Sequence, residues 1–301
     1  MSKGLLHDPA TIDRLRRLRA RFGRLLGRRR EVPPDERPEA ILRELGQSAI
    51  FMLSFGRSGT TVFGDFLASH PDIVKMGEVL NEQTFRSFYR SRRWFFGSGL
   101  PSRVAHNFYL FLRDRARANP RARLLFDMKF EMLHLADGNY RDPGFDFSFF
   151  DAVLQSDCPV ILVERRDHVA RYVSLETAVQ QERFHSYQTG RADRGVTIDI
   201  DRMERVVTAT QGQIAWVLER FAAYPRFLHI AYEDMFLSEG EGTSRFDPAL
   251  AERLAALLGV DNRFDAAPRL ERLSGTAGPD PITNRAEVEA WRASRNPKGL
   301  T

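Results

Sequence analysis

The sequence contains a single cysteine among its 301 residues, Cys158. One cysteine can form neither a disulfide within the chain nor a cysteine-ligated metal cluster. The seven histidines are scattered, without the spacing of a motif such as HExxH, so we expect no metal site. The sequence also lacks a signal peptide and any apolar run of the roughly 18–20 residues that a membrane-spanning helix needs. These absences favour a reducing, intracellular compartment, and we expect a cytoplasmic protein.

Apolar residues make up 43% of the chain and charged residues 28%, as in soluble globular proteins. These proportions argue against a disordered or fibrous protein. A chain of this length has an ample core, as one large domain or two modest ones.

Positive charge is concentrated at the N-terminus. The first 45 residues hold 12 Lys and Arg against 7 Asp and Glu, which leaves 33 of each sign in the remainder. Nine arginines and no acid lie between Arg14 and Arg30, and an apolar stripe repeats at helical spacing among them: Leu15, Leu18, Phe22, Leu25 and Leu26. This helix could adsorb to an anionic membrane or to a partner, or pack on the main body with solvated arginines.

A proline-rich, charged break, EVPPDERPEA over 31–40, follows this segment. We therefore predict a basic amphipathic helix over 1–32, a linker over 33–47 and one domain over 48–301. In that domain, short apolar stretches alternate with helical patterns, which favours an α/β fold: a P-loop-like parallel β-sheet with helices on both faces. The predicted strands are Ala49–Ser54, Ile73–Met76, Leu124–Lys129, Pro159–Val163 and Phe227–Ala231, and the predicted helices are Thr60–Ser69, Arg103–Ala118, Val169–Glu182, Asp199–Tyr224 and Pro248–Leu258.

From Ala49 to Phe63 the chain reads AIFMLSFGRSGTTVF, an apolar strand, a glycine-bearing turn and the start of a helix. A helix N-terminus binds phosphate through its unpaired N–H groups and its dipole. The Walker A pattern GxxxxGK[ST] aligns on Gly59, but Thr60 stands where the lysine belongs. Arg57 supplies a cation inside the loop instead, so the loop suits a 5′-phosphate bearing one further group. An ordinary turn between strand and helix is the simpler alternative.

A second strand-to-helix unit, PVILVERRDHVARYVSLETA, contains another candidate anion site. Arg165 and Arg166 end the strand, and Ser174 lies eight residues after Arg166 on the following helix. Arginine makes bidentate, charge-assisted contacts with phosphate, and serine adds a donor. A surface ion pair of Arg166 with a neighbouring acid, beside a buried serine, is the alternative. Two phosphate sites at neighbouring strand ends would suit a nucleotide phosphorylated on both its 5′ and 3′ oxygens.

These motifs, FGRSGTT, ERRDHVARYVSL and YEDM (232–235), resemble those of the PAPS-dependent sulfotransferases. The resemblance is strongest to the bacterial nodulation-factor and trehalose sulfotransferases and to the Golgi carbohydrate sulfotransferases. It implies that the loop residues Arg57, Ser58, Gly59, Thr60 and Thr61 bind the 5′-phosphosulfate end of PAPS and that Arg166 and Ser174 bind its 3′-phosphate. It covers about residues 49–291, weakly in its later part, and it includes neither the region before Ser48 nor a recognisable acceptor-binding motif.

A general base is needed because the acceptor hydroxyl loses its proton as it attacks sulfur. Glu78 follows the predicted strand 73–76, at a turn on the same sheet edge as the loop. It is similar to the "GE" element of the carbohydrate sulfotransferases, and the resemblance implies that Glu78 is the base. A helix-capping acid is the alternative, and Glu82 is the rival base.

Three further residues are weaker candidates. Lys129 ends a predicted strand and could contact the sulfonate or the acceptor, or simply face solvent. His185 could contact the acceptor, or have no role. Asn284 could lie near the 3′-phosphate or adenine, or cap a helix. The loops Arg90–Arg103 and Phe184–Val196 are expected to line the acceptor cleft.

We therefore predict a sulfotransferase that uses PAPS without a metal and acts on a hydroxyl of a carbohydrate or glycolipid. The alternative is an ATP-dependent, kinase-like phosphotransferase, against which the missing Walker lysine and the lack of a clear Walker B aspartate argue. A membrane scaffold with a degenerate nucleotide fold would not need Arg57, Glu78, Arg166 and Ser174 together. A homodimer and peripheral membrane contact are left open, and nucleic acid is not an expected partner because the body of the protein is neutral.

Overall fold

The computed structural model describes residues 33–80, 101–135, 148–181, 195–238, 244–265 and 281–295. The chain divides into two units, Met1–Arg37 and Pro38–Thr301. Of the first unit, only the last five residues are described, and Pro34–Glu36 among them form a short 3-10 helix. The basic helix expected over 1–32 lies outside the described residues.

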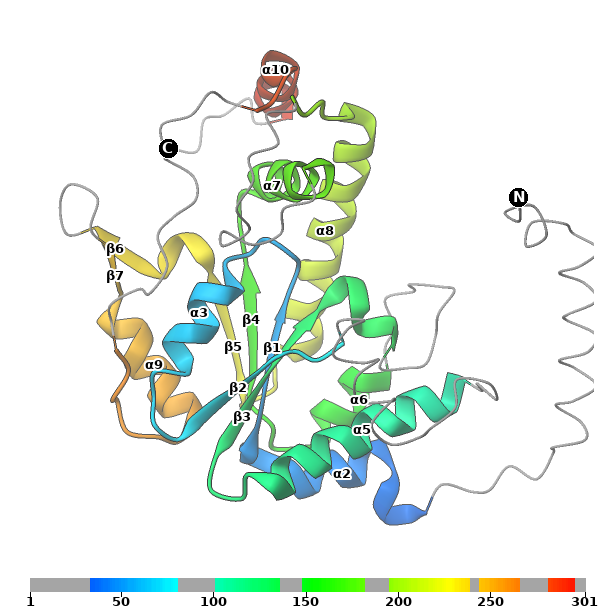
Figure 1. The fold of residues 1–301 in the computed structure, drawn as a ribbon, viewed down its shortest axis with the longest axis vertical. Helices are drawn as coiled ribbons and strands as arrows, with labels where there is room; N and C mark the ends of the chain where they lie inside the picture. The colour runs from blue at the N-terminus through cyan, green and yellow to red at the C-terminus, as the bar shows by residue number, and fades with distance from the viewer. Residues whose placement is uncertain are drawn as a thin grey trace, which may run out of the picture. The chain divides into compact units, whose positions relative to one another are not determined.

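The second unit is built on a five-stranded sheet in the order β2-β3-β1-β4-β5 (Figure 1). Its strands are β1 (Ala49–Ser54), β2 (Ile73–Glu78), β3 (Arg123–Lys129), β4 (Val160–Glu164) and β5 (Phe227–Ala231). Every neighbouring pair is parallel. The carboxyl ends of all five strands therefore point in the same direction, and this is the edge of the sheet where ligands bind in such folds. The predicted α/β fold is confirmed.

Helices cover both faces of this sheet, because its central strands β3, β1 and β4 are apolar on both sides and buried along nearly their whole length. Ile50 and Met52 of β1 pack with α3 (Thr60–Leu67) and α9 (Pro248–Leu258). Phe51 and Leu53, which point the other way, pack with the second group of helices. These are α2 (Pro38–Leu45), α5 (Pro101–Ala118), α6 (Ser148–Leu154) and α8 (Ile200–Phe221).

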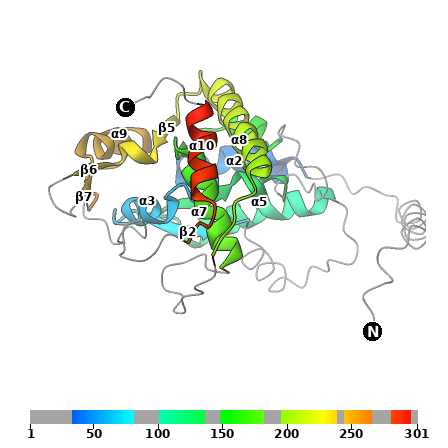
Figure 2. The ribbon, with the colours of Figure 1, turned by 90° about the horizontal axis from the view of Figure 1, so that it is seen from above.

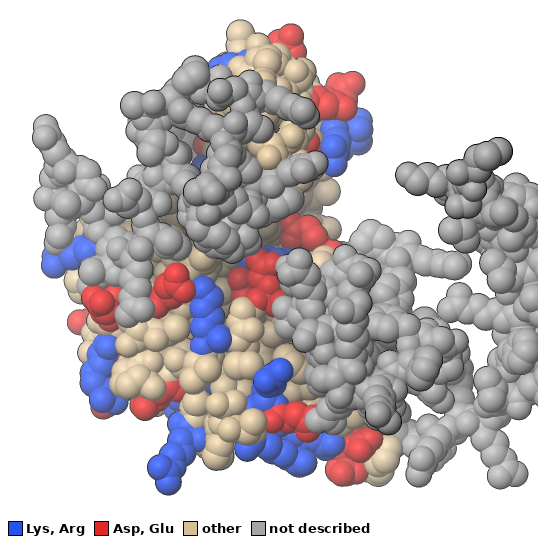
Figure 3. All heavy atoms as spheres, viewed as in Figure 1, with Lys and Arg blue, Asp and Glu red and all other residues tan. Residues whose placement is uncertain are grey.

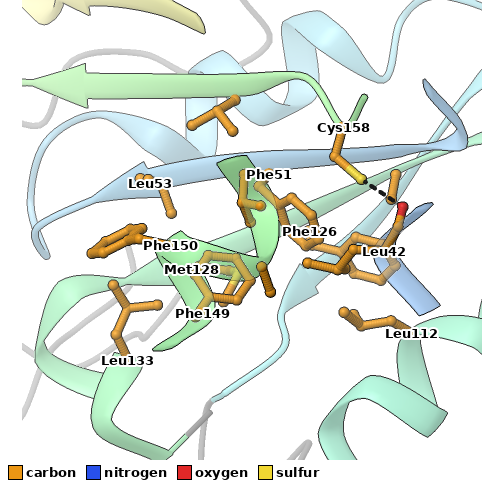
Figure 4. Close-up of a cluster of buried hydrophobic side chains, with 14 of the residues drawn as sticks. Leu42, Phe51, Leu53, Leu112, Phe126, Met128, Leu133, Phe149, Phe150 and Cys158 are labelled. Carbon is orange, nitrogen blue, oxygen red and sulfur yellow. Dashed lines mark hydrogen bonds between the residues drawn. The ribbon is translucent and has the colours of Figure 1, made fainter. Parts of the chain in front are cut away.

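Aromatic rings dominate the larger of these two cores (Figure 4). Phe149 of α6 meets the ring of Phe51 edge-on, with the ring centroids 5.1 Å apart. Each fully buried side chain of this size contributes about 1.5–3 kcal/mol. Cys158 lies in the same core, where its thiol contacts the Leu42 carbonyl at 3.4 Å, and burial raises its pKa to about 12. The cysteine is therefore part of the packing of the core.

A third apolar cluster joins α7 (His168–Gln180), α8 and α10 (Arg285–Arg295). Figure 2 shows α10 crossing over α7 beside α8. Asp167 begins α7 by accepting a hydrogen bond from the Ala170 N–H at 2.8 Å. The same carboxylate binds Arg292 of α10 at 2.9 Å, so one aspartate both caps α7 and holds α10.

Two predictions of element bounds need correction. Residues 38–45 of the expected linker form α2, because Ile41, Leu42 and Leu45 line one face of the helix and are buried in the core. Strand β2 continues through Glu78 instead of ending at Met76, with an irregular register between Lys75 and Gly77. The short antiparallel pair β6 (Phe236–Ser238) and β7 (Ser244–Phe246) was not predicted.

Within the described part of the chain, no helix is both long enough and apolar enough to cross a membrane.

Candidate active site

The turn from β1 to α3, residues 55–59, is the loop that the sequence predicts to bind phosphate and is called the phosphate loop below. It lies at the same end of the sheet as α7 (Figure 1). Gly59 directly precedes the helix with a φ of 80°, a conformation that glycine adopts without strain. A Cβ at this position would also collide with the ring of Tyr232. Arg57 has a φ of 68°, which is unusual for a residue with a side chain. The loop is therefore held in a specific, partly strained conformation in front of the first N–H groups of α3.

Lys129 brings an ammonium group to this loop from the end of β3. Its Nζ donates to Ser54 Oγ at 3.0 Å, to Thr60 Oγ1, and to both carboxylate oxygens of Asp127 at 2.9 and 3.0 Å. The lysine is only 9% exposed, so the alternative that it simply faces solvent is wrong. Thr60 occupies the position of the Walker lysine in the loop. The ammonium that the loop lacks at position 60 is thus supplied by the neighbouring strand.

Asp127 is the buried counter-ion of this lysine and is 4% exposed. Burial raises the pKa of Asp127, and the Lys129 ammonium opposes that rise. The sequence offered a signal for this residue, because Asp127 interrupts the apolar run LLFDMK of a buried strand. A charge at such a position requires a partner.

Glu78 is the last residue of β2 and lies beside the same lysine. Its Oε1 is 3.8 Å from Lys129 Nζ, and its register partner on β3 is Asp127. The Glu78 side chain is 45% exposed and is therefore only partly buried. Its rival Glu82 lies outside the described residues.

The two anion-binding motifs predicted from the sequence meet in the structure. Arg57 Nε of the loop donates to Ser174 Oγ on α7 at 3.0 Å, across 117 positions of sequence. Burial lowers the pKa of Arg57, and so, to a smaller extent, does the charge of Arg165. A bound anion would oppose both of these effects on the pKa of Arg57.

Arg165 and Arg166 lie in different surroundings. The guanidinium of Arg165 lies over the Tyr232 ring, 5.7 Å from its centroid, and Tyr232 is the residue packed against Gly59. Arg166 is exposed, and both of its terminal nitrogens pair with Asp234, one of them at 2.6 Å. Of these two arginines, the structure thus brings Arg165, not Arg166, toward the loop.

The YED segment, a 3-10 turn at Tyr232–Asp234 after β5, connects the two motifs. Besides the contacts of Tyr232 and Asp234, Glu233 accepts hydrogen bonds from the backbone N–H groups of Arg166 and Asp167 at 3.1 and 3.2 Å. This segment therefore fixes the turn between β4 and α7 against the phosphate loop.

The remaining candidate residues fall into three groups. Ser58 is buried in the loop, whereas Thr61 is exposed in the first turn of α3. Asn284 precedes α10, and its side chain bonds both the N–H and the C=O of Ile198 at 2.9 Å, so the structure gives it a structural role. His185 lies outside the described residues, as do the expected acceptor loops, except for their ends at 101–103 and 195–196. Among the residues that the structure describes, no group of three or more His, Cys, Asp and Glu is arranged to hold a metal ion.

Comparison with known proteins gives structural matches alone. No protein-family model and no curated protein sequence matches the chain. The structure of mouse sulfotransferase SULT7A1 complexed with PAP is 14% identical, with a TM-score of 0.40 over 75% of this chain and 64% of the mouse chain. The chain therefore spans less than two thirds of that protein.

Two bacterial structures give similar values. The sulfotransferase domain of the olefin synthase of Synechococcus PCC 7002 is 18% identical, with a TM-score of 0.36 over 84% of this chain and 90% of that domain. The sulfotransferase STF9 of Mycobacterium avium is 14% identical, with a TM-score of 0.39 over 96% of this chain and 76% of that chain. All three TM-scores lie below 0.5, and the function is therefore inferred below from the residues of this chain.

Proposed function

We propose that the protein is a sulfotransferase that moves a sulfuryl group from PAPS to a hydroxyl of a carbohydrate or glycolipid. The observation that carries this proposal is the hydrogen bond from Arg57 to Ser174, which unites a phosphate loop with a second cationic site. One site alone would suit any phosphate. Two adjacent sites suit a nucleotide with phosphates on both its 5′ and 3′ oxygens.

The residues present suit the anionic end of such a nucleotide. The loop residues Arg57 to Thr61 offer backbone N–H groups at the N-terminus of α3, and Lys129 and Arg57 offer positive charge. For the 3′-phosphate we propose Ser174 together with an arginine of the Arg165–Arg166 pair. PAPS would supply the sulfuryl group, and this chain would bind and orient it.

Glu78 is proposed as the general base. The acceptor oxygen would form a bond to sulfur as the bond from sulfur to the 5′-phosphate oxygen breaks, and the hydroxyl proton would pass to the Glu78 carboxylate. Adenosine 3′,5′-bisphosphate would leave. The position of Glu78 at the end of β2, next to Lys129 and partly exposed, supports this role, because a base must reach both the acceptor and the loop.

One observation favours an ATP-dependent phosphotransferase as the second candidate. Asp127 is a buried aspartate on the strand next to β1, where P-loop enzymes carry the aspartate that binds magnesium. In this chain, however, both oxygens of Asp127 are engaged by Lys129. We therefore rank this function below sulfuryl transfer.

Thermal unfolding with two nucleotides separates the candidates. Adenosine 3′,5′-bisphosphate should raise the melting temperature in a Mg²⁺-free buffer, since a hundredfold excess over Kd stabilises by about 2.7 kcal/mol. ATP, tested with and without Mg²⁺, should have a smaller effect. Equal or greater stabilisation by ATP would exclude the sulfotransferase.

A further inference from the structure

Gly56, at the start of the phosphate loop, is held on both sides by side chains from distant parts of the chain. Its N–H donates to Glu131 Oε1 at 3.0 Å. Its carbonyl accepts from Arg171 Nη1 at 3.3 Å. Glu131 belongs to the 3-10 helix Phe130–Leu135, which follows Lys129, and Arg171 belongs to α7. Neither residue was a candidate from the sequence.

Arg171 is a buried cation that joins the start of the phosphate loop to α8. It is 2% exposed, its Nη2 donates to Thr210 of α8 at 2.9 Å, and its guanidinium lies over the Phe55 ring at 5.0 Å. Glu131 is the acid that faces it, at 3.9 Å, and Arg171 Nε has no hydrogen-bond partner among the described residues. Burial lowers the pKa of Arg171, and the charge of Glu131 opposes that change. A buried charge is costly, and its retention here is explained by a function that requires it.

That function is to hold a loop that would not keep its shape alone. The residue after Gly56 is Arg57, whose positive φ is unfavourable for a residue with a Cβ. Such a conformation persists only when the surroundings fix it. Arg171 holds the backbone just before Arg57, and Ser174, three residues further along α7, contacts the Arg57 side chain. One face of α7 thus supports both the backbone and the cation of the loop.

We propose that Arg171 and Glu131 are positioning residues that clamp Gly56 and thereby hold the phosphate loop in its binding conformation. The proposal rests on the proposed function, because it assumes that the loop receives the 5′-phosphate. A clamp on the loop acts on every ligand with a 5′-phosphate. A residue that contacts the 3′-phosphate would act on the bisphosphate alone.

The test compares two nucleotides by calorimetry, adenosine 3′,5′-bisphosphate and AMP, which lacks the 3′-phosphate. Arg171→Met should weaken the binding of both nucleotides by the same factor, about tenfold or more. The affinities of Arg171→Lys should lie between those of Arg171→Met and the wild type. Glu131→Gln should also weaken both. Arg113→Met is the control, since Arg113 is likewise a largely buried arginine but lies on α5.

Amide hydrogen exchange of residues 55–60 without any nucleotide gives a second, independent measurement. Arg171→Met should speed exchange in this loop by about tenfold or more, while exchange in β3 and β4 stays as in the wild type. This measurement does not depend on which nucleotide the protein uses.

Several outcomes would overturn the clamp. One is wild-type affinity of Arg171→Met for both nucleotides, and another is a loss of affinity in Arg171→Met that is confined to adenosine 3′,5′-bisphosphate. A third is tighter nucleotide binding by Glu131→Gln, which would mean that the Glu131 carboxylate competes with phosphate for the loop. If Arg171→Met does not fold, wild-type affinity in both Arg171→Lys and Glu131→Gln overturns it. If the wild-type protein binds neither nucleotide, the proposed function fails. The clamp is then tested by hydrogen exchange alone, and unchanged amide exchange of residues 55–60 in the variants overturns it.

Discussion

The adjacent residues Arg165 and Arg166 have opposite surroundings, and this difference can be tested directly. Arg166 is paired with Asp234, and both side chains of that ion pair are 57% exposed. Arg165 lies over the ring of Tyr232, which itself packs against Gly59 of the loop. An exposed ion pair contributes little stability, but it keeps the Arg166 guanidinium engaged with Asp234.

Arg165→Ala should therefore weaken the binding of adenosine 3′,5′-bisphosphate about tenfold or more, through loss of a charge-assisted contact. Arg166→Ala should weaken the binding of this nucleotide by a smaller factor. AMP binding should change little in both variants, since AMP has no 3′-phosphate. Calorimetry on the two variants side by side decides the assignment, and a larger loss in Arg166→Ala would restore the arginine that the family resemblance implies.

The proposed base can be tested by a change that keeps its shape. Glu78→Gln retains the hydrogen-bonding outline of the side chain but cannot accept the acceptor proton, so turnover should fall by about 10²–10⁴-fold. The affinity for adenosine 3′,5′-bisphosphate should stay near the wild-type value, and binding and rate should be measured on one preparation.

Glu82→Gln is the matched control and should keep most of the activity. An inactive Glu82→Gln beside an active Glu78→Gln would show that Glu82 is the base. Full activity in both would mean that the acceptor proton goes to a different group.

At the scale of single residues, the candidates that the sequence offered are groups that lie within a motif. Arg57 follows β1, Glu78 ends β2 and Ser174 lies on the helix after β4, and such a pattern of strand, turn and helix is visible in one dimension. Arg171 and Glu131 could not be predicted in the same way, because their roles arise from contacts across 115 and 75 positions of sequence. An arginine in an amphipathic helix is ordinarily taken for a solvent-facing residue, and only the packing of α7 against α8 shows that this one is buried.

Among the elements, the strands were predictable because a buried parallel strand is apolar on both faces. β1 is buried along its whole length, and β3 nearly so. α2 was missed for a local reason, since Pro33, Pro34 and Pro38 mark a break although proline is well tolerated in the first turn of a helix. β6 and β7 have three residues each, too few for a pattern of alternation.

One junction of elements is expected to depend on pH. Glu164 at the end of β4 accepts a hydrogen bond from His229 of β5 at 2.7 Å and lies 3.4 Å from His168 Nε2 of α7. The contacts with His168 and His229 lower the pKa of Glu164 to about 2. A carboxylate with a depressed pKa in the folded state stabilises the protein fully above its unfolded pKa of about 4.5, and that contribution is lost as the pH falls toward 2.

Glu164→Gln should therefore lower the free energy of unfolding at pH 7 by at most about 3 kcal/mol, which is the pKa shift expressed as energy before solvent screening. The difference from the wild type should shrink below pH 4.5 and vanish near pH 2. Urea unfolding at pH 7, 5, 4 and 3 measures this change. Glu219→Gln, an exposed carboxylate of α8, should have little effect at any of these pH values. A Glu164→Gln difference that stays constant across the range would contradict the assignment.

For the whole molecule, the contrast between the basic N-terminus and the neutral remainder is the main electrostatic feature. On the face drawn in Figure 3, the visible Lys and Arg side chains of the described residues are interspersed with Asp and Glu. The excess positive charge of the chain thus comes from the first 45 residues. Any long-range attraction of the protein to an anionic surface is therefore expected to depend on that segment.

Deleting residues 1–32 tests this directly. Adenosine 3′,5′-bisphosphate binding should survive the deletion, because the phosphate loop, Lys129 and Ser174 all belong to the unit that begins at Pro38. If the arginine-rich stripe is a membrane device, the full-length protein should co-sediment with anionic vesicles at low salt and lose that binding as salt rises, and the deletion should abolish it.

Replacing Arg28, Arg29 and Arg30 by glutamine in the full-length chain separates the contribution of charge to vesicle binding from that of apolar contact. Each basic residue near such a surface contributes about 1 kcal/mol, so this triple variant should bind vesicles far more weakly while its nucleotide affinity is unchanged. A full-length protein that ignores anionic vesicles at low salt would exclude the membrane role and favour packing of this segment on protein.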